Sequence, residues 1–557
     1  MRLMNPSLVA AALLALATAA CGADADGASA FDTNGWNTPD AIGGTDTTTG
    51  SDIWSPADTS APSDAIASDT YIPPPDAEDE QDFDLRTPEA GGSYLYIPSA
   101  GLDALVVVDA TDLAVHLVEV GVEPTLVRAL PDDHGAVVLN SGSYDLSIVR
   151  PIDRGEFTVK TVDVLPDHNR MVLSPDGEWA FVWFDPDVGG TGGFGSLQDV
   201  SAVRLVPGEE VVYNLAVGYR PTEVVFTASG TIALFFCENG ISGAVLAELD
   251  GDAFLPPVAV DENPFQKPVD REIKVTPDGE MAVVRDLVVS PRLTLVGLHD
   301  HTIHNLELPD WPSDLDMTPD GGTVVVPMKS TQQVAIVQVP DAFMWEAPEP
   351  VDDNATPEEN PFVTISFTGS HFGSAVMTAD GSRALLYTTE PGTQAIGMVD
   401  VASGQVGVQP LAKEVTSVLV SLDGRMAALL HRKTSGADQS LVGVEAYSLL
   451  DLDSGFSKIV TVDNAVDKVI FTDDSLELFV LMPDAWGTDH LVHRVSTRSF
   501  AVIPYTTPDA PIFVGAMPTI HKVAIALDNP TGWITLIDTE TDEVDQVNSF
   551  ELNSFIE

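Results

Sequence analysis

The stretch YLYIPSAGLDALVVVDATDLAVHLVEVGVEPTLVRALPDDHG, residues 94–135, shows best a pattern that recurs about ten times in residues 94–550. Each unit contains short runs of Val, Ile, Leu and Phe bounded by Asp, Gly, Pro and Ser, which is typical of strands joined by tight turns. Gly in such turns adopts a positive φ without steric strain. Sustained helical periodicity is absent from the sequence, so the pattern predicts an all-β chain.

The most regular part of each unit is a turn related to Pro-Asp-Gly, which an apolar strand follows at once. Examples of this turn are SPDGEW (174–179), TPDGEM (276–281), TPDGGT (318–323), TADGSR (378–383) and SLDGRM (421–426). All-strand units that repeat every ~40–50 residues are typical of a β-propeller. We therefore predict a β-propeller built of four-stranded blades in residues 93–557.

The number of blades follows less directly from the sequence. Nine to ten repeat units can be counted, which is more than the usual four to eight blades. One large closed ring is favoured, and two smaller rings are the alternative. The first unit lacks a recognisable preceding strand and the last unit lacks a final strand. We therefore expect the two ends of the chain to complete one shared blade, which would remove the exposed edges.

Several segments resemble the YVTN-type propeller repeat. The similar segments are VVVDATD (106–112), VGVEPTLV (120–127), VGYRPTEVVFTASG (217–230), GMVDVASG (397–404) and TLIDTETD (535–542). The resemblance extends over nearly all of residues 94–550, and it implies a propeller of the kind found in bacterial surface lipoproteins. It is specific for the fold and says little about function.

The N-terminus has the pattern of a secretion signal. Arg2 precedes the apolar run LVAAALLALATAA (8–20), which is shorter than the ~20 residues that span a bilayer. The following TAAC (18–21) resembles the lipobox of bacterial lipoproteins, which implies cleavage before Cys21 and its acylation. Several acyl chains form a stable membrane anchor. An ordinary secretion signal with an incidental cysteine is the alternative, and Gly22 favours the outer over the inner membrane.

Residues 1–20 are thus the predicted signal peptide, and residues 21–92 are a predicted disordered linker. The linker is rich in Asp, Thr, Ser and Pro and has few large apolar residues, so it cannot bury enough surface to fold. The whole chain carries a formal net charge of −60. Such an acidic chain is unsuited to nucleic acid, which needs a basic face, and to anionic lipid headgroups.

A candidate ligand site lies at one mouth of the predicted central channel. In propellers of this type the strand that leads into the Pro-Asp-Gly turn lines the channel. The residues just before it are Glu123, Arg170, Arg220, Glu223, Arg271, Glu272, Asp314, His371, Lys413, Lys468 and Asp509. We select from them Arg170, Arg220, Arg271, Asp314, His371 and Lys468 as the candidate ligand site. A partly basic mouth would attract an anionic ligand, whereas the alternative is that the cations pair with neighbouring carboxylates.

No motif in the sequence demands catalysis, a metal or a cofactor. His299 and His301 fall in a hairpin turn without a second pair of ligands, so we expect no metal site. Nucleophile elbows, Cys–His pairs and His-Glu-x-x-His motifs are absent from the sequence. We therefore expect a lipid-anchored scaffold on the cell envelope that binds a protein, a glycan or a small anion. The alternative is a hydrolase similar to the lactonase-type propellers, with Arg170, Arg271, Asp314 and His371 in its channel.

Overall fold

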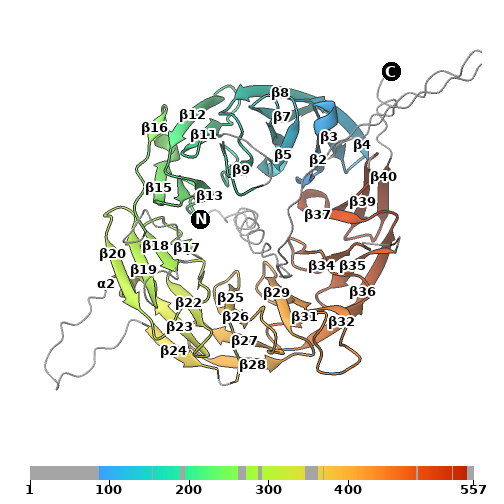
Figure 1. Cartoon of the computed structure of the whole chain (residues 1–557). Coiled ribbons are helices and arrows are strands. Elements are labelled where there is room, and N and C mark those ends of the chain that lie inside the picture. The colour runs from blue at the N-terminus through green and yellow to red at the C-terminus, as the bar shows by residue number, and fades with distance from the viewer. Residues whose placement is uncertain are drawn as a thin grey trace, which may run out of the picture. The chain divides into compact units, whose positions relative to one another are not determined.

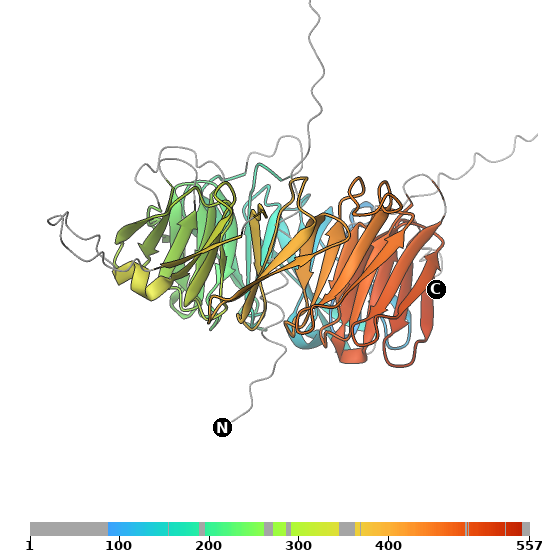
Figure 2. The same cartoon turned by 90° about the horizontal axis from the view of Figure 1, so that it is seen from below.

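The described part of the chain is a propeller of ten blades. The computed structural model describes residues 87–548, except 154, 189–194, 261–270, 286–290, 345–361, 368, 485–486, 488 and 530. The described residues form ten β-sheets, which surround a central axis in one ring (Figure 1). The side view shows that the blades stand next to one another in a disc (Figure 2). The prediction of an all-β propeller with four-stranded blades is confirmed.

In each blade the strands follow one another from the channel outward, and neighbouring strands are antiparallel. The strands of blades 1 to 5, in chain order, are β1 (Glu89–Ala90), β2 (Tyr94–Ser99), β3 (Ala104–Asp109) and β4 (Ala114–Glu119); β5 (Pro124–Ala129), β6 (Ala136–Asn140), β7 (Asp145–Asp153) and β8 (Glu156–Asp163); β9 (Arg170–Leu173), β10 (Trp179–Trp183), β11 (Asp199–Arg204) and β12 (Val211–Ala216); β13 (Pro221–Phe226), β14 (Ile232–Cys237) and β15 (Gly240–Val245); β17 (Glu272–Val275), β18 (Met281–Arg285), β19 (Arg292–Gly297) and β20 (Ile303–Glu307).

Blades 6 to 10 repeat this order. Their strands are β21 (Asp316–Met317), β22 (Thr323–Met328), β23 (Gln333–Gln338) and β24 (Phe362–Ser366); β25 (Ser374–Met377), β26 (Arg383–Tyr387), β27 (Ala395–Asp400) and β28 (Val406–Pro410); β29 (Val415–Val420), β30 (Met426–His431), β31 (Glu445–Asp451) and β32 (Ser457–Val462); β33 (Lys468–Phe471), β34 (Glu477–Met482), β35 (His490–Ser496) and β36 (Val502–Thr507); β37 (Pro511–Met517), β38 (Lys522–Leu527), β39 (Trp533–Asp538) and β40 (Val544–Asn548).

Blade 4 is the exception to the four-stranded pattern. The described residues give it three strands, and the next segment contributes β16 (Ala253–Phe254) as a parallel fifth strand on the outer edge of blade 3. The helix α2 (Val339–Met344) follows β23. Within the described ranges, no helix has the length and apolar character needed to cross a membrane.

The ring closes by packing between two complete blades, so the expected shared blade is wrong. β1 pairs with β2 in blade 1, and β40 pairs with β39 in blade 10. Side chains of the two blades, among them Leu95 and Ile97 of blade 1 and Met517 and Leu536 of blade 10, form one buried apolar cluster. The sequence did not reveal β1 because it has only two residues and precedes the expected boundary at residue 93.

The Pro-Asp-Gly turns join the innermost strand of a blade to the second strand. In blade 5 the hydroxyl of Thr276 donates a hydrogen bond to Asp278 Oδ1 at 2.6 Å, and the N–H of Met281 donates to the same hydroxyl oxygen at 3.1 Å. Gly279 has a φ of 78°, which favours glycine. The same hydroxyl–carboxylate pair recurs in blades 3, 6, 7, 8 and 9. This local chemistry explains why the turn recurs in the sequence.

Basic side chains of one blade bind the turn between the third and fourth strands of the next blade. Each donates to a backbone carbonyl oxygen of that turn: Arg150 to Leu205, Arg383 to Leu452, Lys458 to Phe500, Arg494 to Thr539 and Lys522 to Ala110. These contacts join blades 2–3, 7–8, 8–9, 9–10 and 10–1. Five of the few basic residues of this chain therefore stabilise the ring rather than provide free positive charge.

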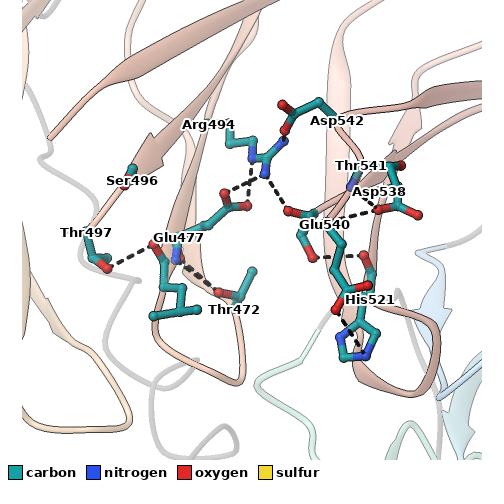
Figure 3. A network of polar contacts seen from close by, with 12 residues as sticks. Thr472, Glu477, Arg494, Ser496, Thr497, His521, Asp538, Glu540, Thr541 and Asp542 are labelled. Carbon is teal, nitrogen blue, oxygen red and sulfur yellow. Dashed lines mark hydrogen bonds and ion pairs between the residues drawn. The ribbon is translucent and has the colours of Figure 1, made fainter. Parts of the chain in front are cut away.

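The contact between blades 9 and 10 is the most elaborate of these (Figure 3). Arg494 donates to both carboxylate oxygens of Glu477, at 2.7 Å and 2.6 Å, and to Asp542 Oδ1 at 2.5 Å. Only 5% of the Arg494 side chain is exposed. Charge-assisted bidentate contacts of this kind are stronger than neutral hydrogen bonds. They fix blade 9 against the outer turn of blade 10.

Candidate functional site

The six residues selected from the sequence lie at the start of innermost strands, which surround the channel (Figure 1). Each belongs to a different strand start: Arg170 (β9), Arg220 (β13), Arg271 (β17), Asp314 (β21), His371 (β25) and Lys468 (β33). They therefore share one side of the ring, opposite the Pro-Asp-Gly turns. The structure brings some of them together and leaves others apart.

The arginines of blades 3 and 4 contact carboxylates of nearby loops. Arg170 lies 3.3 Å from Asp185 Oδ2, and Asp185 is buried. Arg220 bridges two blades, because its two terminal nitrogens lie 2.8 Å from Asp187 Oδ2 and 2.6 Å from Glu238 Oε1. These contacts follow the second interpretation of the sequence, in which the cations pair with neighbouring acids.

Arg271 joins the same group. Its Nη1 donates to the carbonyl oxygen of Glu238 at 3.0 Å, so Arg220 and Arg271 meet at one residue of the turn between β14 and β15. The guanidinium groups of Arg220 and Arg271 are thus already in contact with oxygen atoms of the protein. An incoming anion would have to compete with these acceptors.

Asp314 belongs to a network of charged residues in blades 5 and 6. It forms a hydrogen bond with the carboxyl group of Glu272, and its Oδ2 accepts from the N–H of Ala375 in blade 7 at 2.7 Å. Lys274 lies 3.5 Å from Glu272 Oε1 and 3.4 Å from Asp316 Oδ1. The innermost strands of three consecutive blades are therefore linked by polar contacts.

The network changes the protonation of its members. Burial and the neighbouring carboxylate of Asp314 raise the pKa of Glu272 to about 7, although Lys274 and Arg285 act in the opposite direction. Burial lowers the pKa of Lys274, but the surrounding carboxylates outweigh this effect and raise it. The pKa of Glu272 therefore lies closer to neutral pH than that of an ordinary carboxyl group.

His371 and Lys468 have contacts with other residues. His371 Nε2 is 3.0 Å from the amide nitrogen of Gln332, and Lys468 donates to the carbonyl oxygen of Ile512 in blade 10. The six residues are therefore spread over separate contacts in blades 3 to 10. The contacts found for Arg170, Arg271, Asp314 and His371 are with other residues of the described part of the chain.

The remaining residues of the expected mouth have structural contacts of their own. Lys413 is fully buried and donates to the carbonyl oxygens of Lys433, Ser435 and Leu441 at 3.1, 2.5 and 2.7 Å. Burial lowers the pKa of Lys413. The N–H of Glu123 donates to Asp103, Asp509 accepts from Asn529, and burial raises the pKa of Glu223.

A cleft of about 340 Å³ lies between blades 6 and 7, on the same side of the ring; we name it the Trp311 cleft. Four segments line it, with the residues Trp311, Pro312, Ser313, Lys329, Ser330, Gly373, Ser374, Thr388, Thr389 and Glu390. Trp311 is 38% exposed, and Lys329 forms an ion pair with Glu390. Across the described ranges, no three His, Cys, Asp or Glu side chains are grouped to hold a metal ion.

The sequence analysis did not identify the Trp311 cleft. Apart from Ser374, which begins β25, its residues lie in connections between strands, whereas the residues selected from the sequence lie at the starts of innermost strands. The available signal was the position of Trp311 in the connection LPDWPSDL (308–315), just before Asp314. Only the folded ring brings this connection next to the loop at 388–390.

Comparisons with known proteins show similarity at the level of the fold. No family model and no curated protein matches the chain. Among solved structures, a eukaryotic initiation factor is 10% identical, with a TM-score of 0.46 over 73% of this chain and 94% of that chain. Dihydro-heme d1 dehydrogenase NirN in complex with DHE is 15% identical, with a TM-score of 0.39 over 67% and 74%. The β-propeller domain of Cps50 (Swd1) from Myceliophteria thermophila is 11% identical, with a TM-score of 0.31 over 59% and 96%. These values carry no argument about function.

Proposed function

We propose that this chain is a bacterial lipoprotein, anchored through Cys21, whose propeller is a binding scaffold on the cell envelope rather than an enzyme. The apolar run at 8–20 that ends in small residues directly before Cys21 supports the anchor. The acidic segment at 21–86, which lies outside the described residues, would serve as the linker between the anchor and the propeller. The outer membrane is the proposed location.

One observation carries the scaffold proposal: the charged side chains at the channel mouth are engaged with protein partners. Arg170 binds Asp185, Arg220 binds Asp187 and Glu238, and Lys468 binds a backbone carbonyl. Catalysis needs acid, base and electrophilic groups that converge on one reacting atom. Contacts distributed over many blades instead favour a rigid ring that presents loops and clefts to a partner.

A second candidate function rests on the carboxyl pair of Glu272 and Asp314. A general acid or base works best when its pKa lies near the ambient pH, and the pKa of Glu272 is raised to about 7. This favours the alternative of a hydrolase that is similar to lactonase-type propellers. A hydrolase would act on a panel of sugar lactones, and the Glu272→Gln variant would lose that activity. If no lactone is hydrolysed, this alternative is rejected.

The anchor is tested by metabolic labelling of expressing bacteria with an alkyne analogue of palmitate. We expect label on the wild-type chain in the membrane fraction and none on the Cys21→Ala variant, which should be released as a soluble protein. Equal labelling of both chains, or no label on the wild type, would contradict the anchor. Capture of envelope components by the unlabelled variant then tests the scaffold function separately.

A further inference from the structure

The Trp311 cleft combines one aromatic surface with many hydroxyl groups. Ser313, Ser330, Ser374, Thr388 and Thr389 all line it. The hydroxyls of Ser330, Ser374 and Thr389 have no hydrogen-bond partner in the described part of the chain. Each can both donate and accept a hydrogen bond. The cleft therefore offers several unused polar groups beside an exposed indole.

The loop at 388–390, which lines part of the Trp311 cleft, is contacted from blade 8. Arg432 donates to the carbonyl oxygen of Thr389, and its Nε lies 3.0 Å from Glu414 Oε2. Glu414 in turn accepts from the N–H of Gly392 at 2.9 Å. The hydroxyl of Thr388 accepts from the N–H of Glu390 at 3.2 Å. The loop at 388–392 is therefore fixed before any ligand arrives, which reduces the entropy lost on binding.

Two classes of ligand fit this cleft poorly. An apolar ligand needs several apolar walls, and only Trp311 and Pro312 supply such surface here. An anion would meet Lys329, but its ammonium group already binds the carboxylate of Glu390, and the chain as a whole carries a charge of −60. The five hydroxyl side chains and the single aromatic surface suit an uncharged ligand that is rich in hydroxyl groups and has one apolar face.

We infer that the Trp311 cleft binds a saccharide. One face of a sugar ring presents C–H groups, which stack on the apolar face of an indole, while its hydroxyls point outward to polar partners. The Lys329–Glu390 pair adds a donor and an acceptor for these hydroxyls. A cleft of this volume is at the lower end of small-ligand sites, so it fits about one or two sugar rings. The inference rests on the proposed scaffold function and names its ligand class.

The test measures binding of defined oligosaccharides to the full chain by isothermal titration calorimetry and tryptophan fluorescence, in a detergent without a sugar headgroup. The panel contains malto-, cello-, chito- and manno-oligosaccharides. We expect at least one of them to bind with a Kd between micromolar and millimolar. We expect Trp311→Ala to weaken that binding more than about tenfold, which is more than 1.4 kcal/mol. Trp311→Phe should retain part of the affinity, since it keeps an aromatic face.

Two further variants make the result specific. Ser374→Ala with Thr389→Ala should weaken binding several-fold while it leaves the fold intact. Phe254→Ala, which removes an aromatic side chain that is 74% exposed on β16, should leave the affinity unchanged. The inference is overturned if no oligosaccharide binds at millimolar concentration, or if Trp311→Ala and Phe254→Ala bind equally well. A chain that is acylated at Cys21 and captures a protein partner, but binds no saccharide, would overturn this inference and leave the scaffold function standing.

Discussion

The ammonium group of Lys522 donates a hydrogen bond to the carbonyl oxygen of Ala110 at 3.0 Å, although 412 positions separate the two residues in the chain. The same group lies 2.9 Å from Asp545 Oδ2. Lys522 begins β38 in the last blade, and Ala110 follows β3 in the first. The contact thus repeats, between the two ends of the chain, the basic contact that joins consecutive blades elsewhere in the ring.

Replacement of Lys522 by Met should weaken the closure of the ring. The variant removes a charge-assisted hydrogen bond and an ion pair from a side chain that is 13% exposed, so we expect the free energy of unfolding to fall by about 1.5–3 kcal/mol. Urea denaturation followed by circular dichroism measures this change. Lys433→Met is the matched control, because its ion pair with Glu445 is 55% exposed on the lysine side and should contribute less than about 1 kcal/mol. If the two variants lose the same free energy of unfolding, the contact that closes the ring contributes no more than an exposed ion pair.

Replacement of Arg494 by Met should destabilise the chain more strongly. The variant leaves the half-buried carboxylate of Glu477 without its partner, and we expect a loss of about 3–5 kcal/mol. A second replacement, Glu477→Leu, should restore much of the stability, because it removes the unpaired charge. Arg204→Met, which breaks an exposed pair with Glu209, is the control and should have little effect. If the double variant is no more stable than Arg494→Met, the buried charge is not the cause of the loss.

The carboxyl group of Glu272 should make the protein less stable as the pH rises. Its pKa is raised from 4.5 to about 7, so between these values the folded chain binds more protons than the unfolded chain. The free energy of unfolding should therefore fall from pH 4.5 to pH 7, by at most about 3 kcal/mol. Glu272→Gln should remove this contribution. The measurement is the free energy of unfolding of the variant and of the wild type, each plotted against pH. Glu280→Gln, at an exposed side chain, should leave the curve unchanged, and a similar slope in all three proteins would contradict the assignment.

Two buried histidines should have the opposite effect. Burial lowers the pKa of His168 and of His431 to about 4, from an ordinary value of 6.5. Between these values the unfolded chain binds more protons, so stability should fall as the pH drops from 6.5 to 4, by up to about 3 kcal/mol for each group.

The contribution of His431 is isolated by the variant His431→Gln, which retains a polar partner for the hydroxyl of Ser448, 2.7 Å away. When thermal unfolding is measured across this pH range, the Tm of the variant should fall less than that of the wild type as the pH drops. His299→Gln, whose ring is 70% exposed, should behave like the wild type. If His431→Gln loses stability in acid as steeply as the wild type, the histidine is not the group that titrates.

The apolar strands and their turns could be predicted because the relevant interactions are local. In the turn from Thr276 to Met281, the hydrogen bonds of the Thr276 hydroxyl lie within six residues of sequence, so the same residue types recur wherever the turn recurs. Strands of two residues, such as β1 and β21, leave no such pattern. The prediction therefore succeeded for the blades and failed at the closure of the ring.

The site could be predicted only in part, because alignment of the repeats gives the position of a residue but not the direction of its side chain. Lys413 occupies the aligned position of a channel-mouth residue, yet its ammonium group is buried among three carbonyl oxygens. The Trp311 cleft joins segments as far apart as Trp311 and Glu390. Such a site exists only after neighbouring blades have packed.

The closure between blades 1 and 10 has a consequence for the evolution of the ring. Apart from β16, every described strand belongs to a blade formed from one continuous segment, and no strand passes from blade 10 into blade 1. Duplication or deletion of one such segment would therefore change the circumference without reassigning any strand to another sheet. A circular permutation that places the chain ends between any other two blades would likewise preserve every hydrogen-bonded ladder.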